Sequence, residues 1–185
     1  MKKILFLAFL LYGLQSKCQN QTFVKVNTFT TLLTIPNVAI ETTIGKKSTL
    51  NFDVLASFWK SFDSKPFQFY TFTSEYRYHF QEIDRGFYAG GHIGASIYRF
   101  QKWNYLNTDL YEKGHGYFIG ATIGYKAKIN DKFQLDCFLG GGWHQGFYKG
   151  YRISDGSRYD KVTNYNKSGE WLPYRGGVML SYKIN

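Results

Sequence analysis

Apolar and polar residues alternate along most of the chain, most clearly between residues 67 and 100. Aromatic and aliphatic side chains recur at every second position on both sides of the four residues 82–85, so that one face of each run is mostly apolar. A period of two is typical of β-strands, and two such runs joined by a short turn predict a β-hairpin. Each arm reaches the roughly 9–11 residues that a tilted strand needs to cross a bilayer.

The same period predicts eight strands, which we expect at residues 22–33, 38–44, 50–58, 67–80, 87–100, 117–129, 133–144 and 172–184. Short turns at 45–47, 82–85 and 130–132 alternate with longer connections that include the loops 101–113 and 152–170. Aromatic residues recur near both ends of the expected strands, with Trp171 and Tyr174 in the belt on the long-loop side. Short turns at one end, long loops at the other and aromatic girdles are typical of outer-membrane barrels. The fold class predicted is all-β, an eight-stranded antiparallel up-and-down transmembrane β-barrel.

The first residues are typical of an export signal. Lys2 and Lys3 precede an apolar segment at 4–14 that is too short to span a membrane, and residues 16–18 offer a cleavage site before Gln19. We therefore expect a signal peptide at 1–18 and an outer-membrane β-barrel domain at 19–185. Acylation of Cys18 is the alternative to its removal.

Composition and charge exclude several classes of protein and of binding partner. The mean hydropathy of -0.35 excludes a bundle of apolar membrane helices but not a barrel, whose strands are only half apolar. The net charge of +10 comes from lysines and arginines scattered along an exported chain, so we expect no nucleic-acid partner. After the signal only Cys137 remains, which rules out an internal disulfide and a metal-thiolate cluster. We expect no cofactor and no metal.

The strand faces that turn inward carry ionisable side chains. Turn lengths set the register: pairing Gln81 with Gly86 places Glu75 opposite His92, and a tight turn at 130–132 places Lys126 opposite Asp136. Eight strands leave an interior that side chains fill, so we expect a plugged, charge-paired lumen. The predicted lumenal polar network is Glu41, Asp53, Glu75, Arg77, His92, Lys126 and Asp136.

A catalytic interpretation is the main alternative. His92 with Ser96 and Glu75 would be the candidates for a lipid- or envelope-modifying enzyme, but four residues along one strand separate His92 from Ser96 by roughly 13 Å. That distance is too long for direct proton transfer, and the chain has no G-x-S-x-G motif. A soluble periplasmic ligand-binding barrel is a further alternative, because its polar face could point outward. We expect a non-enzymatic structural or interaction protein.

The chain resembles the uncharacterised outer-membrane β-barrel proteins of Bacteroidetes over nearly all of its length after the signal. The residues that carry the resemblance are Pro36, Asn37, Glu41, Gly45, Lys46, Lys47, Ser48, Leu50, Asn51, Asp53, Glu75, Tyr76, Arg77, Tyr78, Gly120, Gly124, Tyr125 and 140–142. The resemblance implies export and an outer-membrane barrel, and the family has no established catalytic residues to carry over.

Recognition is expected in the two long loops, because loops carry binding residues and aromatic and arginine side chains are frequent at contact sites. The partners expected are outer-membrane lipid and envelope or extracellular proteins. The contact candidates are Trp103, Tyr105, Tyr111, Tyr151, Arg152 and Arg158.

Overall fold

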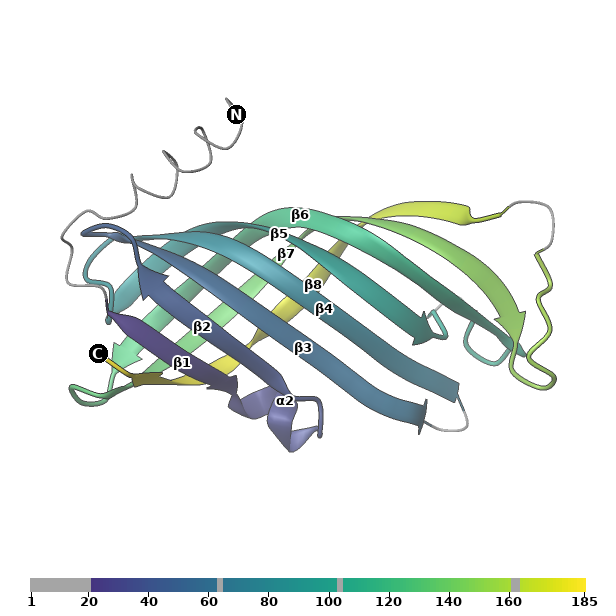
Figure 1. Cartoon of the computed structure of the whole chain (residues 1–185), viewed down its shortest axis with the longest axis horizontal. Coiled ribbons are helices and arrows are strands. Elements are labelled where there is room, and N and C mark those ends of the chain that lie inside the picture. Colours follow the sequence, from purple (N-terminus) through teal and green to yellow (C-terminus); the bar gives the residue numbers. More distant parts are fainter. Residues whose placement is uncertain (1–20, 63–64, 103–104, 161–163) are drawn as a thin grey trace, which may run out of the picture.

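The computed structural model describes residues 21–62, 65–102, 105–160 and 164–185, which form one ring of antiparallel strands. Each strand pairs with the next along the chain, and β8 returns to β1 to make a closed barrel (Figure 1). The prediction of an all-β fold with eight antiparallel strands is confirmed. The elements are β1 Thr22–Asn27, α2 Thr28–Leu32, β2 Asn37–Thr43, β3 Ser48–Phe62, β4 Lys65–His79, β5 Gly86–Phe100, β6 Leu110–Lys128, β7 Phe133–Arg152 and β8 Asn166–Lys183.

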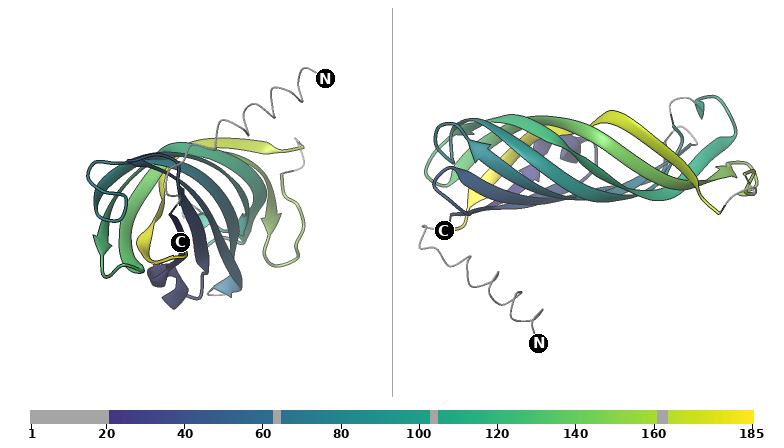
Figure 2. Two further views of the ribbon diagram at one scale, coloured as in Figure 1. Left: turned by 60° about the vertical axis from the view of Figure 1, so that its left-hand side comes forward. Right: turned by 90° about the horizontal axis from the view of Figure 1, so that it is seen from above.

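The two ends of the ring differ. The turns 44–47, 80–85 and 129–132, together with the beginning of β1 and the end of β8, lie at one end, which we call the turn end. The described residues of the loop between β5 and β6 (101–102 and 105–109) and of the loop between β7 and β8 (153–160 and 164–165) lie at the opposite end, the loop end (Figure 2). The predicted signal peptide at 1–18 falls outside the described residues.

The prediction for the first strand is wrong in its second half. β1 ends at Asn27 and the chain enters the short helix α2, whereas the alternation predicts one strand to residue 33. The Asn27 side chain accepts a hydrogen bond from Thr30 N–H, and Thr31 Oγ1 donates to Asn27 C=O at 2.6 Å. These side-chain bonds offer the backbone an alternative to the ladder and begin a helix. Among the described residues no helix is both long and apolar enough to cross a membrane.

The last three strands are longer than the pattern predicted. β6 begins at Leu110, β7 continues to Arg152 and β8 begins at Asn166, so that both predicted loops lose residues to the sheet. Near the loop end the paired residues include Lys113 with Lys149, whose polar side chains do not alternate with apolar ones. The backbone hydrogen bonds between the strands continue past the residues at which apolar and polar side chains stop alternating.

The ring is polar inside and apolar outside. Among the described residues, 22 buried residues are polar or charged and only 8 are hydrophobic, whereas 33 large hydrophobic side chains are exposed. Inward-facing aromatic rings lie over inward-facing glycines; a Cβ on Gly94 would come within 2.2 Å of Phe118 Cζ, and one on Gly124 within 2.4 Å of Tyr88 Cζ. Small residues on one strand therefore make room for the rings that fill the interior.

β8 departs from simple alternation at Pro173. The register between β7 and β8 shifts where Gly140 pairs with Arg175 but Gly142 pairs with Leu172, which is a bulge of one extra residue on β8. Tyr174, which the alternation placed in the outward aromatic belt, instead reaches His92 Nε2 inside the ring at 2.7 Å. The prediction for Tyr174 is wrong because a bulge reverses the face on which the following residues lie.

Candidate functional site

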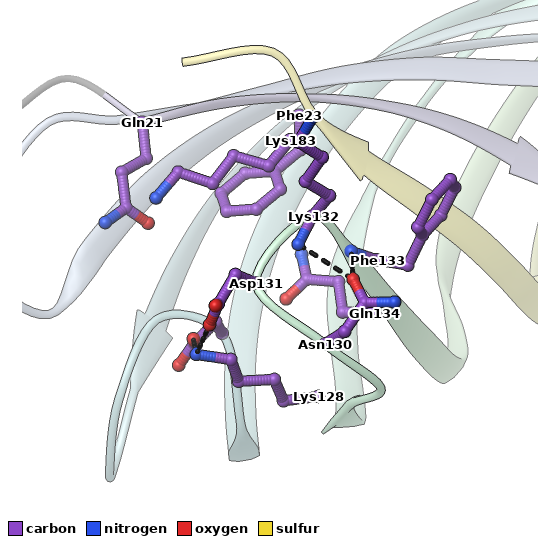
Figure 3. Close-up of a pocket in the computed structure, with 10 residues that line it drawn as sticks. Gln21, Phe23, Lys128, Asn130, Asp131, Lys132, Phe133, Gln134 and Lys183 are labelled. Carbon is purple, nitrogen blue, oxygen red and sulfur yellow. Dashed lines mark hydrogen bonds and ion pairs between the residues drawn. The ribbon is translucent and has the colours of Figure 1, made fainter.

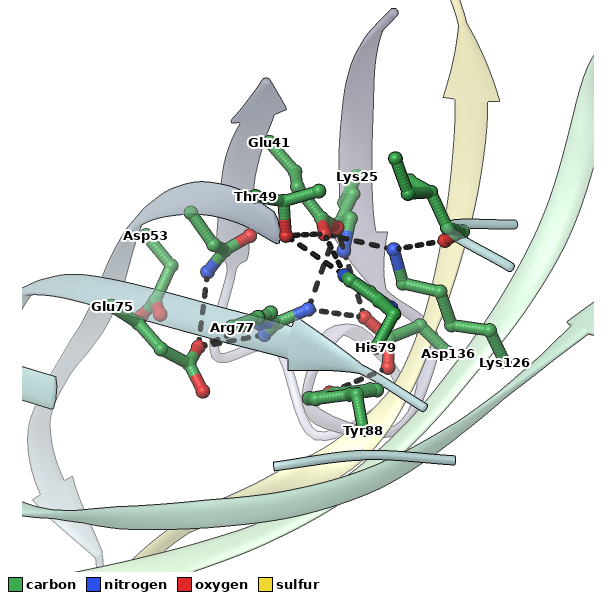
Figure 4. A network of polar contacts seen from close by, with 12 residues as sticks. Lys25, Glu41, Thr49, Asp53, Glu75, Arg77, His79, Tyr88, Lys126 and Asp136 are labelled. Atoms are coloured by element: carbon green, nitrogen blue, oxygen red, sulfur yellow. Dashed lines mark hydrogen bonds and ion pairs between the residues drawn. The ribbon is translucent and has the colours of Figure 1, made fainter. Parts of the chain in front are cut away.

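Arg77 of β4 lies at the centre of a buried network of charges in the half of the interior near the turn end (Figure 4). Its Nη1 donates to Asp136 Oδ2 of β7 at 2.7 Å, and its Nη2 forms an ion pair with Glu75 Oε2 at 2.8 Å. The guanidinium also lies 4.6 Å from the centroid of the Tyr88 ring, whose hydroxyl donates to Asp136 Oδ1 at 2.8 Å. A planar guanidinium with several donors is suited to holding two carboxylates at once.

Two lysines complete this network from other strands. Lys126 Nζ of β6 donates to Glu41 Oε1 of β2 at 2.8 Å and to the Ile83 carbonyl at 3.0 Å. Lys25 of β1 forms an ion pair with Glu41 and another with Asp136 Oδ2 at 2.7 Å. The side chains of Lys25, Glu41, Lys126 and Asp136 are fully buried. The contacts thus join strands from the beginning, middle and end of the chain.

Arg175 of β8 extends the network towards the loop end. Its Nη2 lies 2.7 Å from Asp53 Oδ2 and 3.2 Å from Glu75 Oε2. With it, the formal charges of the network cancel, because four cations face four carboxylates. These groups are Lys25, Arg77, Lys126 and Arg175, with Glu41, Asp53, Glu75 and Asp136. Buried charges require such pairing, and a neutral, filled interior favours neither cations nor anions in transit.

The predicted registers are confirmed, but the facing side chains bond elsewhere. Glu75 lies opposite His92 and Lys126 opposite Asp136, as the turn lengths indicated. Glu75 receives Arg77 and Arg175, whereas His92 hydrogen-bonds with Thr122 Oγ1 at 3.0 Å and with the Tyr174 hydroxyl at 2.7 Å. All seven residues of the predicted lumenal network lie inside the ring, but His92 takes no part in the ion pairs described above.

A serine–histidine pair that sequence reasoning missed lies farther towards the loop end. Ser96 Oγ of β5 is 2.8 Å from His144 Nε2 of β7, and both are inward-facing. Strands β5 and β7 are not neighbours in the ring, so no turn length could indicate this contact. Glu170 is the cross-strand neighbour of His144, but its carboxylate binds Lys102 Nζ at 2.9 Å. The described contacts therefore do not form the acid–histidine–serine chain that activates a nucleophile.

The loop-contact candidates are distributed over strands as well as loops. Tyr111 is buried on β6, where its ring stacks on Tyr151 of β7 with centroids 5.6 Å apart, and Arg99 lies over it at 5.1 Å. Arg152 is the last residue of β7 and pairs with Leu110. Only Tyr105 and Arg158 of the described candidates lie in the loops themselves, and Trp103 falls outside the described residues.

Ion pairs organise the loop end. The Asp160 carboxylate accepts hydrogen bonds from Arg158 Nε and from Gly150 N–H, both at 2.9 Å. Partial burial opposes ionisation, but these bonds outweigh it and hold the pKa of Asp160 below its usual value. Burial likewise opposes the charge of Lys102, yet its hydrogen bond with Glu170 and the nearby Glu112 raise the pKa of Lys102 above its usual value. Both groups are therefore charged at neutral pH and fix the loops to the strand ends.

A cavity of about 230 Å³ opens at the turn end beside the 129–132 turn (Figure 3). Its wall includes Lys128, which forms ion pairs with Asp84 at 3.3 Å and Asp131 at 3.1 Å. The Asn130 side chain accepts hydrogen bonds from the Lys132 and Phe133 N–H groups, as in a capped turn. These contacts stabilise the turn. In the described part of the chain, no group of three or more potential ligands could hold a metal ion.

A family model described as "Protein of unknown function (DUF3575)" matches residues 4–184. No curated protein and no solved structure matches the chain.

Proposed function

Since the chain belongs to the DUF3575 family, whose members share no stated activity, we propose its function from the geometry: an outer-membrane β-barrel with a plugged lumen that acts through its loop end. In this proposal residues 1–18 direct export through the inner membrane of a Gram-negative cell. The resemblance to Bacteroidetes barrels supports the same location. The role is structural or interactive, without catalysis.

The observation that carries the proposal is the inverted distribution of side chains. Ile93, Ile119 and Ile123 are 60%, 57% and 67% exposed on the outside, while Arg77 and Lys126 are fully buried within. A soluble ligand-binding barrel needs the opposite arrangement, because burial of apolar area stabilises a fold in water. An apolar exterior costs nothing in lipid, and a closed ring leaves few backbone groups unpaired there.

The aromatic side chains on the outside of the barrel also support a particular depth of the barrel in the bilayer. The outward aromatic rings near the turn end include Phe87 against Tyr125, with centroids 4.8 Å apart, and Phe133 against Tyr182 at 5.1 Å. Near the other boundary, Trp143 lies against Trp171, 6.2 Å between centroids. Tyrosine and tryptophan rings favour the headgroup level, so two such belts are consistent with a spanning barrel whose turns face the periplasm.

The filled interior supports a role other than passive diffusion of solutes through the lumen. The network from Lys25 to Arg175 and the rings of Tyr88, Phe118 and Phe138 occupy the lumen. Recognition is then assigned to the loop end, where Tyr105 and Arg158 lie on loops fixed to the strand ends by Asp160 and Lys102. Envelope proteins or lipid headgroups are the partners that such a surface suits.

Membrane fractionation with a heat-modifiable gel shift tests the location. We expect the exported protein in the membrane fraction, migrating faster before heating than after it. Ile123→Lys is expected to reduce the inserted fraction, because a lysine facing lipid near the midplane costs about 2–4 kcal/mol. Leu106→Lys, at a loop position that is 54% exposed, is the matched control and should insert normally. A soluble protein with no gel shift, or equal effects of both lysines, would contradict the proposal.

Electrical recording tests the plugged lumen separately. In planar bilayers the inserted protein is expected to give no steady ion current, since the ion pairs around Arg77 fill the interior. A steady current through protein that passes the gel-shift test would show that the lumen is open and that the role is transport.

A further inference from the structure

The wall of the ring is incomplete on one side. β1 pairs with β8 only up to Asn27 with Met179, and β2 pairs with β3 only up to Asn37 with Leu55. Residues 166–178 of β8 and 56–62 of β3 extend beyond these pairs, and we call the stretch between them the seam. The ribbons of β3 and β8 run apart there towards the loop end, with α2 at the inner limit (Figures 1 and 2).

Side-chain exposure along β8 distinguishes the seam from the sealed part of the ring. Met179 and Ser181, where β1 covers the strand, are fully buried. Leu172, whose register partner is the buried Gly142, is 37% exposed, and the Glu170 side chain is 38% exposed. Inward positions of β8 are therefore less covered along the seam than where β1 pairs with the strand.

The borders of the seam are apolar. Phe29 and Leu32 of α2 are 58% and 84% exposed at its inner limit, Phe58 of β3 is 59% exposed on one side, and Trp171 of β8 is 75% exposed on the other. Ile119, which pairs with Trp143 at the height of Trp171, is also exposed to the outside. The seam thus lies within the apolar belt that our proposed function places in lipid.

A second β-strand is a poor occupant for the seam. Pro173 lies in the middle of the open edge, where it offers no N–H, and the bulge beside it bends the strand. At the inner limit, side chains already use the edge carbonyls: Thr28 Oγ1 donates to Val178 C=O at 2.8 Å and Asn27 Nδ2 to Gly176 C=O at 3.3 Å. An occupant without backbone hydrogen bonds, such as a hydrocarbon chain, fits this edge better.

The interior behind the seam offers hydrogen bonds without net charge. The groups there include the Tyr174 hydroxyl on His92 and Ser96 on His144. The charges of the adjacent network cancel, so an ionic headgroup gains nothing on entry. A neutral polar group on an apolar chain, as at the ester linkage of a lipid, matches this environment.

We propose that the seam is a lateral binding site for an acyl chain of an outer-leaflet lipid, with the ester of that chain near Tyr174 and His92. The proposal rests on the proposed function, because only a membrane-inserted barrel presents the seam to acyl chains. Tyr174 is the positioning residue at the interior side and Leu172 the apolar residue at the entrance.

Photo-labelling of the wild-type protein in vesicles tests the site. The probe is a phosphatidylcholine with a diazirine in one acyl chain, whose second chain keeps it in the bilayer, and adducts are located by peptide mass spectrometry. Adducts on Ile123 indicate contact with bulk lipid, and adducts on Tyr174 indicate entry at the seam. Adducts on Met179, on the same strand as Tyr174, would indicate that the probe reaches the sealed interior. Adducts on Ile123 and Tyr174, with those on Met179 at least about tenfold fewer, are the expected result.

The other outcomes separate the two proposals. Adducts on Ile123 alone would overturn the seam while leaving membrane insertion intact. Comparable adducts on Tyr174 and Met179 would overturn lateral entry, since the probe would then reach the whole interior. Absence of adducts from all three positions would overturn both proposals.

Leu172→Asn tests the entrance by placing an amide where the chain would pass. Labelling of Tyr174 is expected to fall several-fold relative to Ile123. Ile119→Asn is the matched control, since it puts the same amide on the outside of β6 at a side chain that is 57% exposed. An unchanged labelling ratio in Leu172→Asn, or an equal fall in Ile119→Asn, would overturn the proposal.

Discussion

Replacing Arg77 with methionine removes the cation on which the buried network depends. Arg77 binds Glu75 and Asp136 at 2.8 and 2.7 Å, and its side chain is fully buried. Methionine keeps much of the apolar contact with Tyr88 but leaves the interior with one net negative charge. Removing one partner from a buried ion pair costs about 3–5 kcal/mol, because the remaining charge stays in a medium of low dielectric constant.

Urea unfolding in lipid vesicles, followed by the gel shift, measures this loss. For a denaturant dependence of about 2 kcal/mol per molar urea, the midpoint of Arg77→Met is expected to fall by roughly 2 M. Adding Glu75→Gln removes one carboxylate as well, which makes the formal charges of the network cancel again. The double variant should therefore recover part of the lost stability. Lys46→Met, at an exposed position of the 44–47 turn, is the control and should change stability by less than about 0.5 kcal/mol.

Two results would refute this reasoning. An Arg77→Met midpoint equal to that of the wild type would mean that the ion pairs contribute nothing beyond a hydrophobic side chain of similar size. A double variant with Glu75→Gln that is no more stable than Arg77→Met would mean that the loss comes from packing and not from an unpaired carboxylate.

The interior glycines and the loop end give further expectations. Gly94→Ala should lower the free energy of unfolding by about 1–3 kcal/mol, because the new Cβ would overlap the Phe118 ring. At Gly91 a Cβ meets nothing within 4 Å, so Gly91→Ala should be neutral or slightly stabilising. Equal effects of the two substitutions would contradict the packing argument. Asp160→Asn should speed amide exchange at Gly150. In the wild type, Asp160 has a lowered pKa, so its stabilisation is complete above the ordinary carboxyl pKa of about 3.9 and is lost only as the pH falls through the lower folded value. Protection of Gly150, corrected for intrinsic rates, should therefore persist at pH values near 3.9; its loss well above that pH would contradict the assignment.

Alternation and turn length predicted the parts of the structure that depend on local geometry. A turn of fixed length sets the register, which is why Glu75 opposite His92 and Lys126 opposite Asp136 could be predicted. The partners that these side chains choose depend on strands that are not neighbours, such as β5 with β7 for Ser96 and His144. Sequence period carries no information about distances across the lumen.

The errors occurred where one residue type suits two conformations. Asn27 and Thr31 fit a strand pattern, but their side chains also bond to the backbone and begin α2. Alternation places Pro173 within a regular strand, but a bulge lies beside it, and the predicted face of Tyr174 is therefore wrong. The ends of β6 to β8 were missed because polar outward residues such as Lys113 give no alternating signal.

The first strand and the last strands of the chain are joined by an ion pair as well as by backbone hydrogen bonds. Lys25 belongs to β1 and Asp136 to β7, and the 2.7 Å ion pair between them forms only when β8 has come to lie beside β1. Before the ring closes, Lys25 can pair with Glu41 of the neighbouring β2 and Asp136 with Arg77 of β4, but the ion pair that links β1 to β7 is absent. Completion of the ring therefore adds a buried contact between opposite charges to the backbone ladder of β1 and β8, so that two kinds of interaction hold the closing strands together.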